Sequence, residues 1–148
     1  MSNWITITKA DLYNSKIAAL IDAADSASLG QSQADRTTGI IADVTLEIRR
    51  RVAKSNQLDQ NTAAIPGGLK PLAVDLIYCR LKVALEMELT DDERAALKAR
   101  HNELDRIADG RDVVDPPDNP IAANPVQSLP APSFGTRRRF FTTRSQDG

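Results

Sequence analysis

The sequence predicts an all-α protein, a small bundle of about four to five helices around a central apolar helix, with an extended proline-rich C-terminal arm. Three observations lead to this prediction. Pro66–Met87 is the longest mostly apolar stretch. The segments around it repeat apolar residues at the three- and four-residue spacings of a helix face. Residues 111–148 hold six of the eight prolines. The chain therefore divides into a helical domain, residues 1–110, and an arm, residues 111–148.

The composition narrows the class of protein. Hydrophobic residues make up 41% of the chain and aromatic residues only 4%, which predicts an aliphatic core. A net charge of −1 for the whole chain does not favour binding to nucleic acid or to a membrane surface. The single cysteine, Cys79, excludes an internal disulfide or a cysteine-based zinc site, and its apolar neighbours indicate a buried thiol. Neither a signal peptide nor a membrane span is expected.

The first 54 residues are expected to form an extended segment and three helices. Residues 1–7 are β-prone, and Trp4 is either a lid on the core or an anchor between subunits. Thr8 is expected to cap a short helix over residues 9–14. A second helix follows Ser15, and a third spans residues 33–54, where Gly39 is expected to mark a close helix crossing. The apolar faces of the last two are Ile17, Leu20, Ile21 and Ala24, then Ile41, Val44, Ile48 and Val52.

A polar loop over residues 55–68 leads to the central helix, which should begin near Lys70 because Pro71 is tolerated in a first turn. Its predicted buried stripe is Leu72, Leu76, Cys79, Val83 and Met87, and its exposed strip is Asp75, Arg80, Lys82, Glu86 and Glu88.

Thr90 and Glu93 fit a capping box that starts the last helix, and Gly110 should end it in the left-handed conformation. The predicted inner face of this helix is Leu97, His101, Leu104, Ile107 and Ala108.

No group of residues forms a catalytic pattern. His101 has no nucleophile or carboxylate at a telling spacing and is interpreted as a packed helix residue. The acidic run Asp91–Glu93 is explained by helix capping rather than by a metal. Residues 49–51 are three arginines, interpreted as a solvated face or as inter-subunit salt bridges rather than a phosphate site. The sequence therefore predicts a non-enzymatic protein without cofactor or metal.

The arm carries the strongest functional signal. It holds all three phenylalanines of the chain, and residues 133–148 contain four arginines and one aspartate, a net charge of +3. The alternatives are a terminus without a role and an arm that docks on another chain, and the second is favoured. The predicted partner-binding residues are Phe134, Arg137, Arg138, Arg139, Phe140, Phe141 and Arg144.

Three segments, taken in order, follow the pattern of a known family. Thr8–Leu12 matches a "T-x-x-D-L" helix start, Gly68–Leu81 matches its apolar central helix, and Leu104–Gly110 matches its "L-x-x-I-A-x-G" ending. In this order and spacing they resemble the phage head–tail connector proteins, or head-completion adaptors, including those of Mu-like prophages. The loop before Pro66 lacks an aromatic residue that is often found there.

This resemblance implies an all-helical, non-enzymatic virion protein that forms a ring, commonly a dodecamer, in the neck between head and tail. Its partners would be the portal protein, a tail-side neck or stopper protein and copies of itself. Genomic DNA would pass through the channel, and no membrane is involved. Assembly would take place in the host cytoplasm. The candidate subunit-interface residues are Trp4, Glu47, Arg50, Arg51, Asp75 and Arg80.

A second hypothesis from another class remains open. The chain could be a helical nucleic-acid-binding regulator that places the arginines of residues 137–139 and 49–51 on phosphates. The net charge of −1 and the lack of a recognisable helix-turn-helix argue against it.

Overall fold

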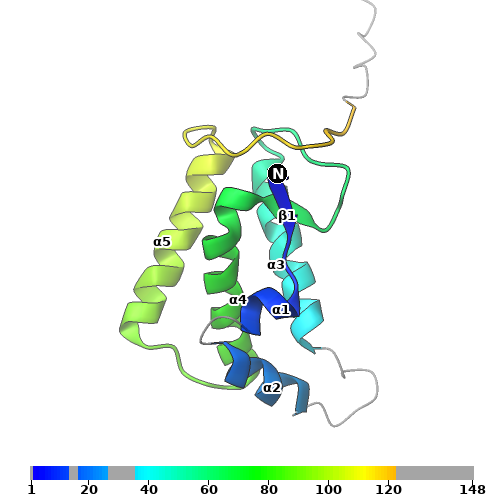
Figure 1. The fold of residues 1–148 in the computed structure, drawn as a ribbon. Coiled ribbons are helices and arrows are strands. Elements are labelled where there is room, and N and C mark those ends of the chain that lie inside the picture. The colour runs from blue at the N-terminus through cyan, green and yellow to red at the C-terminus, as the bar shows by residue number, and fades with distance from the viewer. Residues whose placement is uncertain (1, 14–16, 27–35, 123–148) are drawn as a thin grey trace, which may run out of the picture.

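The computed structural model describes residues 2–13, 17–26 and 36–122. These residues form five α-helices, one 3-10 turn and two short strands (Figure 1). The prediction of an all-α bundle is confirmed in its main part, and the small sheet is an addition to it. The elements are β1 (Trp4–Thr6), α1 (Lys9–Tyr13), α2 (Ala18–Ser26), α3 (Arg36–Val52), β2 (Ala64–Pro66), η2 (Gly67–Leu69), α4 (Lys70–Ala84) and α5 (Asp91–Ala108).

α4 is the central helix, as predicted, and packs against α2, α3 and α5. It begins at Lys70 with Pro71 in its first turn, where the missing N–H has no partner inside the helix in any case. Apolar residues from several sides of α4 are enclosed, because helices lie on more than one face of it. Its buried residues are Leu72, Ala73, Leu76, Ile77, Cys79 and Leu81.

The predicted buried stripe of α4 is wrong at its C-terminal end. Val83 is 62% exposed and Met87 is 45% exposed. α4 ends at Ala84, and Met87 belongs to the turn beyond it. Helical periodicity continues to predict burial there because it does not report where the neighbouring helices stop. An apolar surface therefore remains open at this end of the bundle.

α3 buries the predicted stripe of Ile41, Val44, Ile48 and Val52. It ends at Val52, two residues before the predicted end, while residues 33–35 lie outside the described part of the chain. The expected close crossing at Gly39 is wrong. Gly39 is exposed, and no atom of another element lies within 4 Å of the position that a Cβ would take.

The N-terminal segment forms a strand rather than a free arm. β1 pairs antiparallel with β2 in the register Trp4 to Pro66, Ile5 to Ile65 and Thr6 to Ala64. β2 lies inside the segment that the sequence predicts to be a loop, because a three-residue strand is too short to show an alternating pattern. Of the two alternatives for Trp4, the structure shows the core position, since the side chain is 3% exposed.

The shorter helices and the start of α5 agree with the sequence. Leu12, Ile17, Ile21 and Ala24 are buried. Thr90 and Glu93 form the predicted capping box at the start of α5. Gly110 has a φ of +75°, so it ends α5 in the left-handed conformation.

Residues 111–122, which we call the strap, follow α5 and lie against the helical domain. Figure 1 shows the strap running across one end of the bundle, from the end of α5 toward the loop before β2. Its far end is tied to that loop by the bonds from Gln60 N to Asn119 O, 2.8 Å, and from Ile121 N to Leu58 O, 2.9 Å. The first part of the predicted arm is thus attached to its own domain.

Candidate interaction surfaces

The described residues contain no cluster of histidine, cysteine and acidic side chains that could hold a metal ion. The Cys79 thiol is buried, and burial raises its pKa, so the reactive thiolate is disfavoured. His101 is not the packed core residue that the sequence predicts, because its side chain is 42% exposed. Its Nδ1 lies 3.7 Å from Glu47 Oε1, and this pair includes no serine or cysteine that could act as a nucleophile.

Four of the predicted interface residues are ion-paired within the protomer. Arg80 of α4 bonds to Glu47 of α3, and Arg51 of α3 bonds to Asp105 of α5. Asp75 of α4 accepts from Arg100 Nε of α5 at 2.8 Å. These pairs tie the three long helices together at the surface, where each contributes little to stability. The charges of these four residues are therefore partly neutralised within the protomer. The fifth charged candidate, Arg50, is exposed.

Arg49 is the main departure from the predicted arginine run. It is 6% exposed and donates to three main-chain carbonyl oxygens. Nη1 lies 2.9 Å from Asn61 O and 2.7 Å from Ala64 O, and Nη2 lies 2.8 Å from Asp59 O. Burial lowers its pKa. Arg49 therefore holds the loop before β2 onto α3 and is not available to a phosphate or to a neighbouring subunit.

Trp4 connects the N-terminal strand to the strap. Its indole Nε1 donates to Asp115 O at 2.9 Å, and its main-chain N donates to Asp118 Oδ2 at 3.0 Å. Asp118 also accepts from Asn3 N at 3.0 Å and from Ser2 Oγ at 2.7 Å. These bonds lower the pKa of Asp118, with the two main-chain donors as the largest cause. One carboxylate of the strap thus holds the start of the chain.

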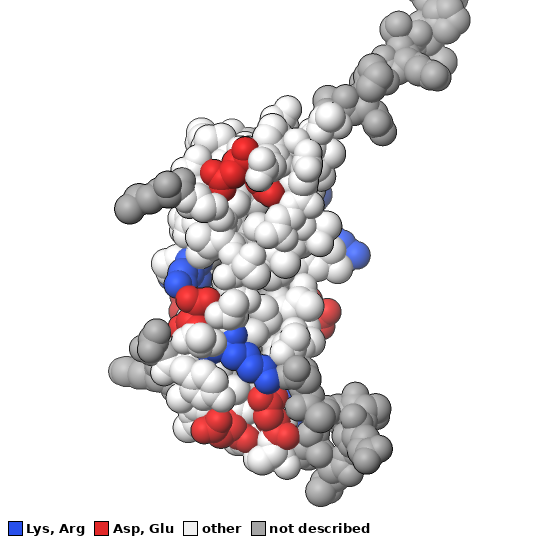
Figure 2. Space-filling view, turned by 45° about the vertical axis from the view of Figure 1, so that its right-hand side comes forward, with Lys and Arg blue, Asp and Glu red and all other residues white. Residues whose placement is uncertain are grey.

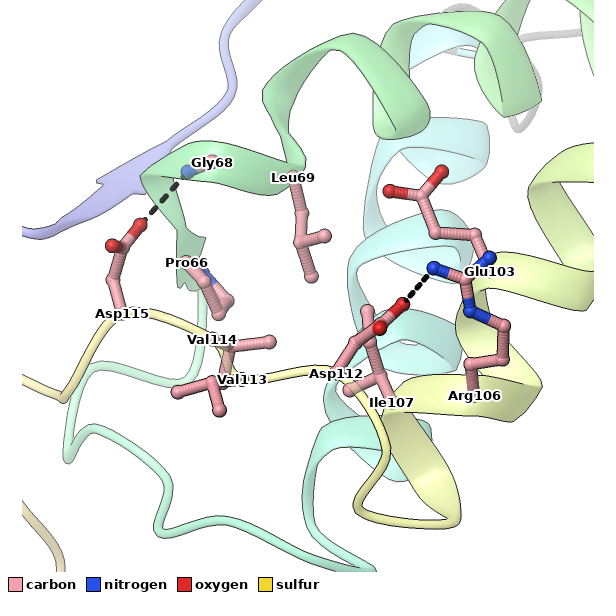
Figure 3. A pocket seen from close by; sticks show the side chains of 10 residues that line it. All are labelled: Pro66, Gly68, Leu69, Glu103, Arg106, Ile107, Asp112, Val113, Val114 and Asp115. Carbon is pink, nitrogen blue, oxygen red and sulfur yellow. Dashed lines mark hydrogen bonds and ion pairs between the residues drawn. The ribbon is translucent and has the colours of Figure 1, made fainter.

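A cavity of about 330 Å³ lies between the strap, η2 and the end of α5 (Figure 3). Asp115 accepts from Gly68 N at 3.0 Å on one side, and Asp112 accepts from Arg106 Nη2 at 2.6 Å on the other. Val113 lies between the two aspartates that make these hydrogen bonds and is 93% exposed. Asp112 and Asp115 thus hold the strap at the two sides of this cavity.

A mainly apolar groove of about 300 Å³, which we call the α4–α5 groove, lies beside α4. The groove lies between the C-terminal half of α4 and the middle of α5. Arg80 and His101 stand among otherwise apolar or small side chains. The lining residues are Ile40, Leu76, Cys79, Arg80, Val83, Ala84, Leu89, Leu97 and His101.

A second surface, the β1–α3 patch, is a hollow of about 430 Å³ without a charged side chain. Its most exposed large apolar residue is Leu46, at 48%. The side of the molecule that carries α3 and the loop before β2 comes forward in Figure 2, where much of the upper and middle surface is uncharged. The lining residues are Thr6, Ile7, Thr38, Ile41, Ala42, Thr45, Leu46, Thr62 and Ala63.

The seven residues predicted to bind a partner lie outside the described residues: Phe134, Arg137, Arg138, Arg139, Phe140, Phe141 and Arg144. Sequence reasoning missed both apolar surfaces and the role of Asp118. Two aspartates that flank Pro116 and Pro117 are a signal for a turn that bonds main-chain donors, and they could have pointed to the strap.

Comparisons with known protein families, with characterised proteins and with solved structures find no match to this chain. None of the helices in the described ranges is long and apolar enough to cross a bilayer.

Proposed function

We propose that this chain is a structural virion protein, a head–tail adaptor that forms a ring beneath the portal and joins the capsid to the tail. The proposal begins from the order and spacing of the helix motifs at residues 8–12, 68–81 and 104–110. A mainly helical domain with a central apolar helix is consistent with it.

The observation that carries the proposal is the pair of separate apolar surfaces. The α4–α5 groove and the β1–α3 patch share no lining residue and are formed largely by different elements. A two-fold dimer uses one self-complementary patch, whereas a ring needs two different patches that meet head to tail. A protomer with two distinct, largely apolar hollows offers two separate docking places, as the second arrangement requires.

In this proposal the partners are the portal protein, a tail-side neck or stopper protein and copies of the same chain in a ring, with twelve subunits as the expected number. Genomic DNA would pass through the channel. The place of action is the neck of the virion, after assembly in the host cytoplasm. The protein binds and positions and performs no chemical reaction.

The regulator hypothesis gains no support from the described residues. Arg49 is buried on main-chain carbonyls and Arg51 is paired with Asp105, so two of the three arginines at residues 49–51 are already engaged.

Light scattering and negative-stain imaging of the full chain, alone and with portal rings from the same source, test the proposal. We expect rings, either free or formed on the portal. Leu46→Arg places a charge in the β1–α3 patch and should prevent ring formation, while Val113→Arg, the same change of charge on the exposed strap, should not. A small dimer that shifts the mobility of DNA and ignores the portal would overturn the proposal.

A further inference from the structure

The α4–α5 groove opens beside a concentration of negative charge. Glu86 and Glu88 in the connection from α4 to α5, and Asp91 and Asp92 in the first turn of α5, are all exposed. No lysine or arginine occurs between Val83 and Glu93. The arginine that lines the groove is already bonded to Glu47. A ligand of this surface should therefore combine apolar side chains with positive charge.

One segment of this chain has that composition. Residues 133–148 contain Phe134, Phe140 and Phe141 together with four arginines, and their net charge is +3. Burial of each phenylalanine ring in an apolar hollow lowers the free energy of the complex. The arginines gain from carboxylates at its edge, since guanidinium–carboxylate hydrogen bonds are among the stronger polar contacts. The Phe140–Phe141 pair, with three arginines directly before it, matches an apolar groove with an acidic rim.

The topology separates the start of the arm from the groove. The groove is lined by the C-terminal half of α4, the middle of α5, Ile40 of α3 and Leu89 of the connection between α4 and α5. The strap lies at the end of the bundle where α5 finishes, and its last described residue, Ala122, is beyond its attachment to Leu58. Figure 1 shows the strap leading away from the side of α5. The arm thus starts far from the groove of its own protomer.

The length of chain after the strap is sufficient to reach a neighbour. The 18 residues of α5 measure about 27 Å along the helix axis. The segment from Ala122 to Phe140 spans about 55 Å if extended at the rise of a polyproline helix. A contact that leaves one end of a protomer and enters the other end of the next is head to tail, the kind that closes into rings.

We infer that the α4–α5 groove is the receptor for residues 133–148 of a neighbouring copy of this chain, with Phe140 and Phe141 in the groove and the arginines on the acidic turn. The inference rests on the proposed ring and names the surface that receives the arm. It assigns the occupant to a second copy rather than to the same protomer or to the portal.

The test uses the full chain with a photoreactive phenylalanine analogue at position 140. Equal amounts of isotopically light and heavy protein are mixed, irradiated at the highest soluble concentration and on portal rings, and analysed by mass spectrometry. We expect cross-links to residues 83–97 in peptide pairs of mixed isotope. Cross-links only within one isotope, cross-links to the portal or to another surface, or no cross-link at all would overturn the inference.

Two variants and a control make the site specific. Val83→Arg places a cation in the groove and should lower the mixed cross-link yield about tenfold or more. The surface double variant Glu86→Lys with Glu88→Lys leaves the core untouched and should also lower it. Val113→Arg should leave it unchanged, and melting temperatures confirm that each variant is folded. Equal yields in all three proteins would contradict the inference.

Failure of the inference and failure of the proposed function can be told apart. If rings form on the portal but position 140 cross-links elsewhere, the adaptor stands and the groove assignment is wrong. If position 140 reaches the groove of a second copy in a species that forms no ring and ignores the portal, the groove assignment stands and the adaptor is wrong.

Discussion

The guanidinium carbon of Arg49 lies 5.5 Å from the centroid of the Trp4 ring, so a cation from α3 stacks on the aromatic side chain of β1 inside the protomer. The same guanidinium group donates to three main-chain carbonyl oxygens in the segment from Asp59 to Ala64. Trp4 in turn donates to Asp115 of the strap. One arginine and one tryptophan thus join α3, the small sheet and the strap.

Replacing Arg49 by Met should destabilise the fold strongly. Three carbonyl oxygens, two of them in buried hydrogen bonds, lose their donor. We expect a loss of about 3 kcal/mol in the free energy of unfolding, measured by urea titration. Arg49→Lys should recover only part of this, because one ammonium cannot reproduce the forked geometry. The matched change Arg50→Met, on the exposed side of α3, should alter stability by less than about 0.5 kcal/mol. Equal effects at positions 49 and 50 would contradict the assigned role.

Asp118 should control the attachment of the strap without controlling the fold. Asp118→Ala removes the acceptor of the main-chain N–H groups of Asn3 and Trp4 and of the Ser2 hydroxyl. We expect amide hydrogen exchange at Asn3 and Trp4 to rise about tenfold, because their N–H groups lose a charged acceptor. Exchange in α4 should stay the same. Asp109→Ala, at the exposed end of α5, is the control and should leave both regions unchanged.

The same contact should respond to acid. The pKa of Asp118 in the folded protein lies below its usual value of 3.8, and so does that of Asp59, whose carboxylate accepts from Asn119 N of the strap. A depressed pKa means that the stabilisation is complete above the unfolded value and is lost as the pH falls below it. The protection factors of Asn3 and Trp4, in which the intrinsic pH dependence of amide exchange is removed, should therefore fall below about pH 4 in the wild-type protein. Asp118→Ala should show a flatter dependence.

The sequence predicted the features that depend on near neighbours. The capping box joins residues three apart, and the buried stripe of α3 follows from a single helical period. Arg49 shows what this reasoning misses, because its partners come from a loop whose path is fixed only by the tertiary structure. The prediction that Val83 is buried is wrong for a related reason. A periodic pattern marks the face of a helix that can be buried, but the lengths of the neighbouring helices decide where burial stops.

The arm shows the same limit. Its composition predicted an extended segment that cannot form a core of its own, and the described part, residues 111–122, forms no helix. Its attachment through Asp115 and Asp118 depends on main-chain donors more than forty residues away, at Gly68, Asn3 and Trp4. A carboxylate that will accept such bonds looks like any exposed aspartate in the sequence.

Glu86 offers a site for stabilisation. It ends α4 with a φ of 57°, and the next residue, Met87, donates its main-chain N–H to Lys82 O at 2.9 Å, which is the Schellman arrangement. A side chain in the left-handed conformation costs about 1–2 kcal/mol relative to glycine. Glu86→Gly should therefore raise the free energy of unfolding by up to about 1 kcal/mol. Glu88→Gly, two residues on and outside the helix end, is the control, and a loss of stability at position 86 would contradict the prediction.

Glu93 should make the α4–α5 turn sensitive to strong acid. Its carboxylate accepts from Lys82 Nζ at 2.7 and 2.9 Å, from Thr90 N at 2.9 Å and from the Tyr78 hydroxyl at 2.8 Å. These bonds, the one from Lys82 first, lower its pKa from 4.5 to about 2.

Because the folded pKa is depressed, the stabilisation from Glu93 is complete above pH 4.5 and is lost as the pH falls toward 2. Urea unfolding of the wild-type protein at several pH values between 6 and 2 should show this loss. Glu93→Gln keeps an acceptor for Thr90 N but has no charge for Lys82, so it should be less stable at pH 6 and should lose less on acidification. Parallel curves for the wild-type and Glu93→Gln proteins would show that the Lys82–Glu93 pair does not set the acid response.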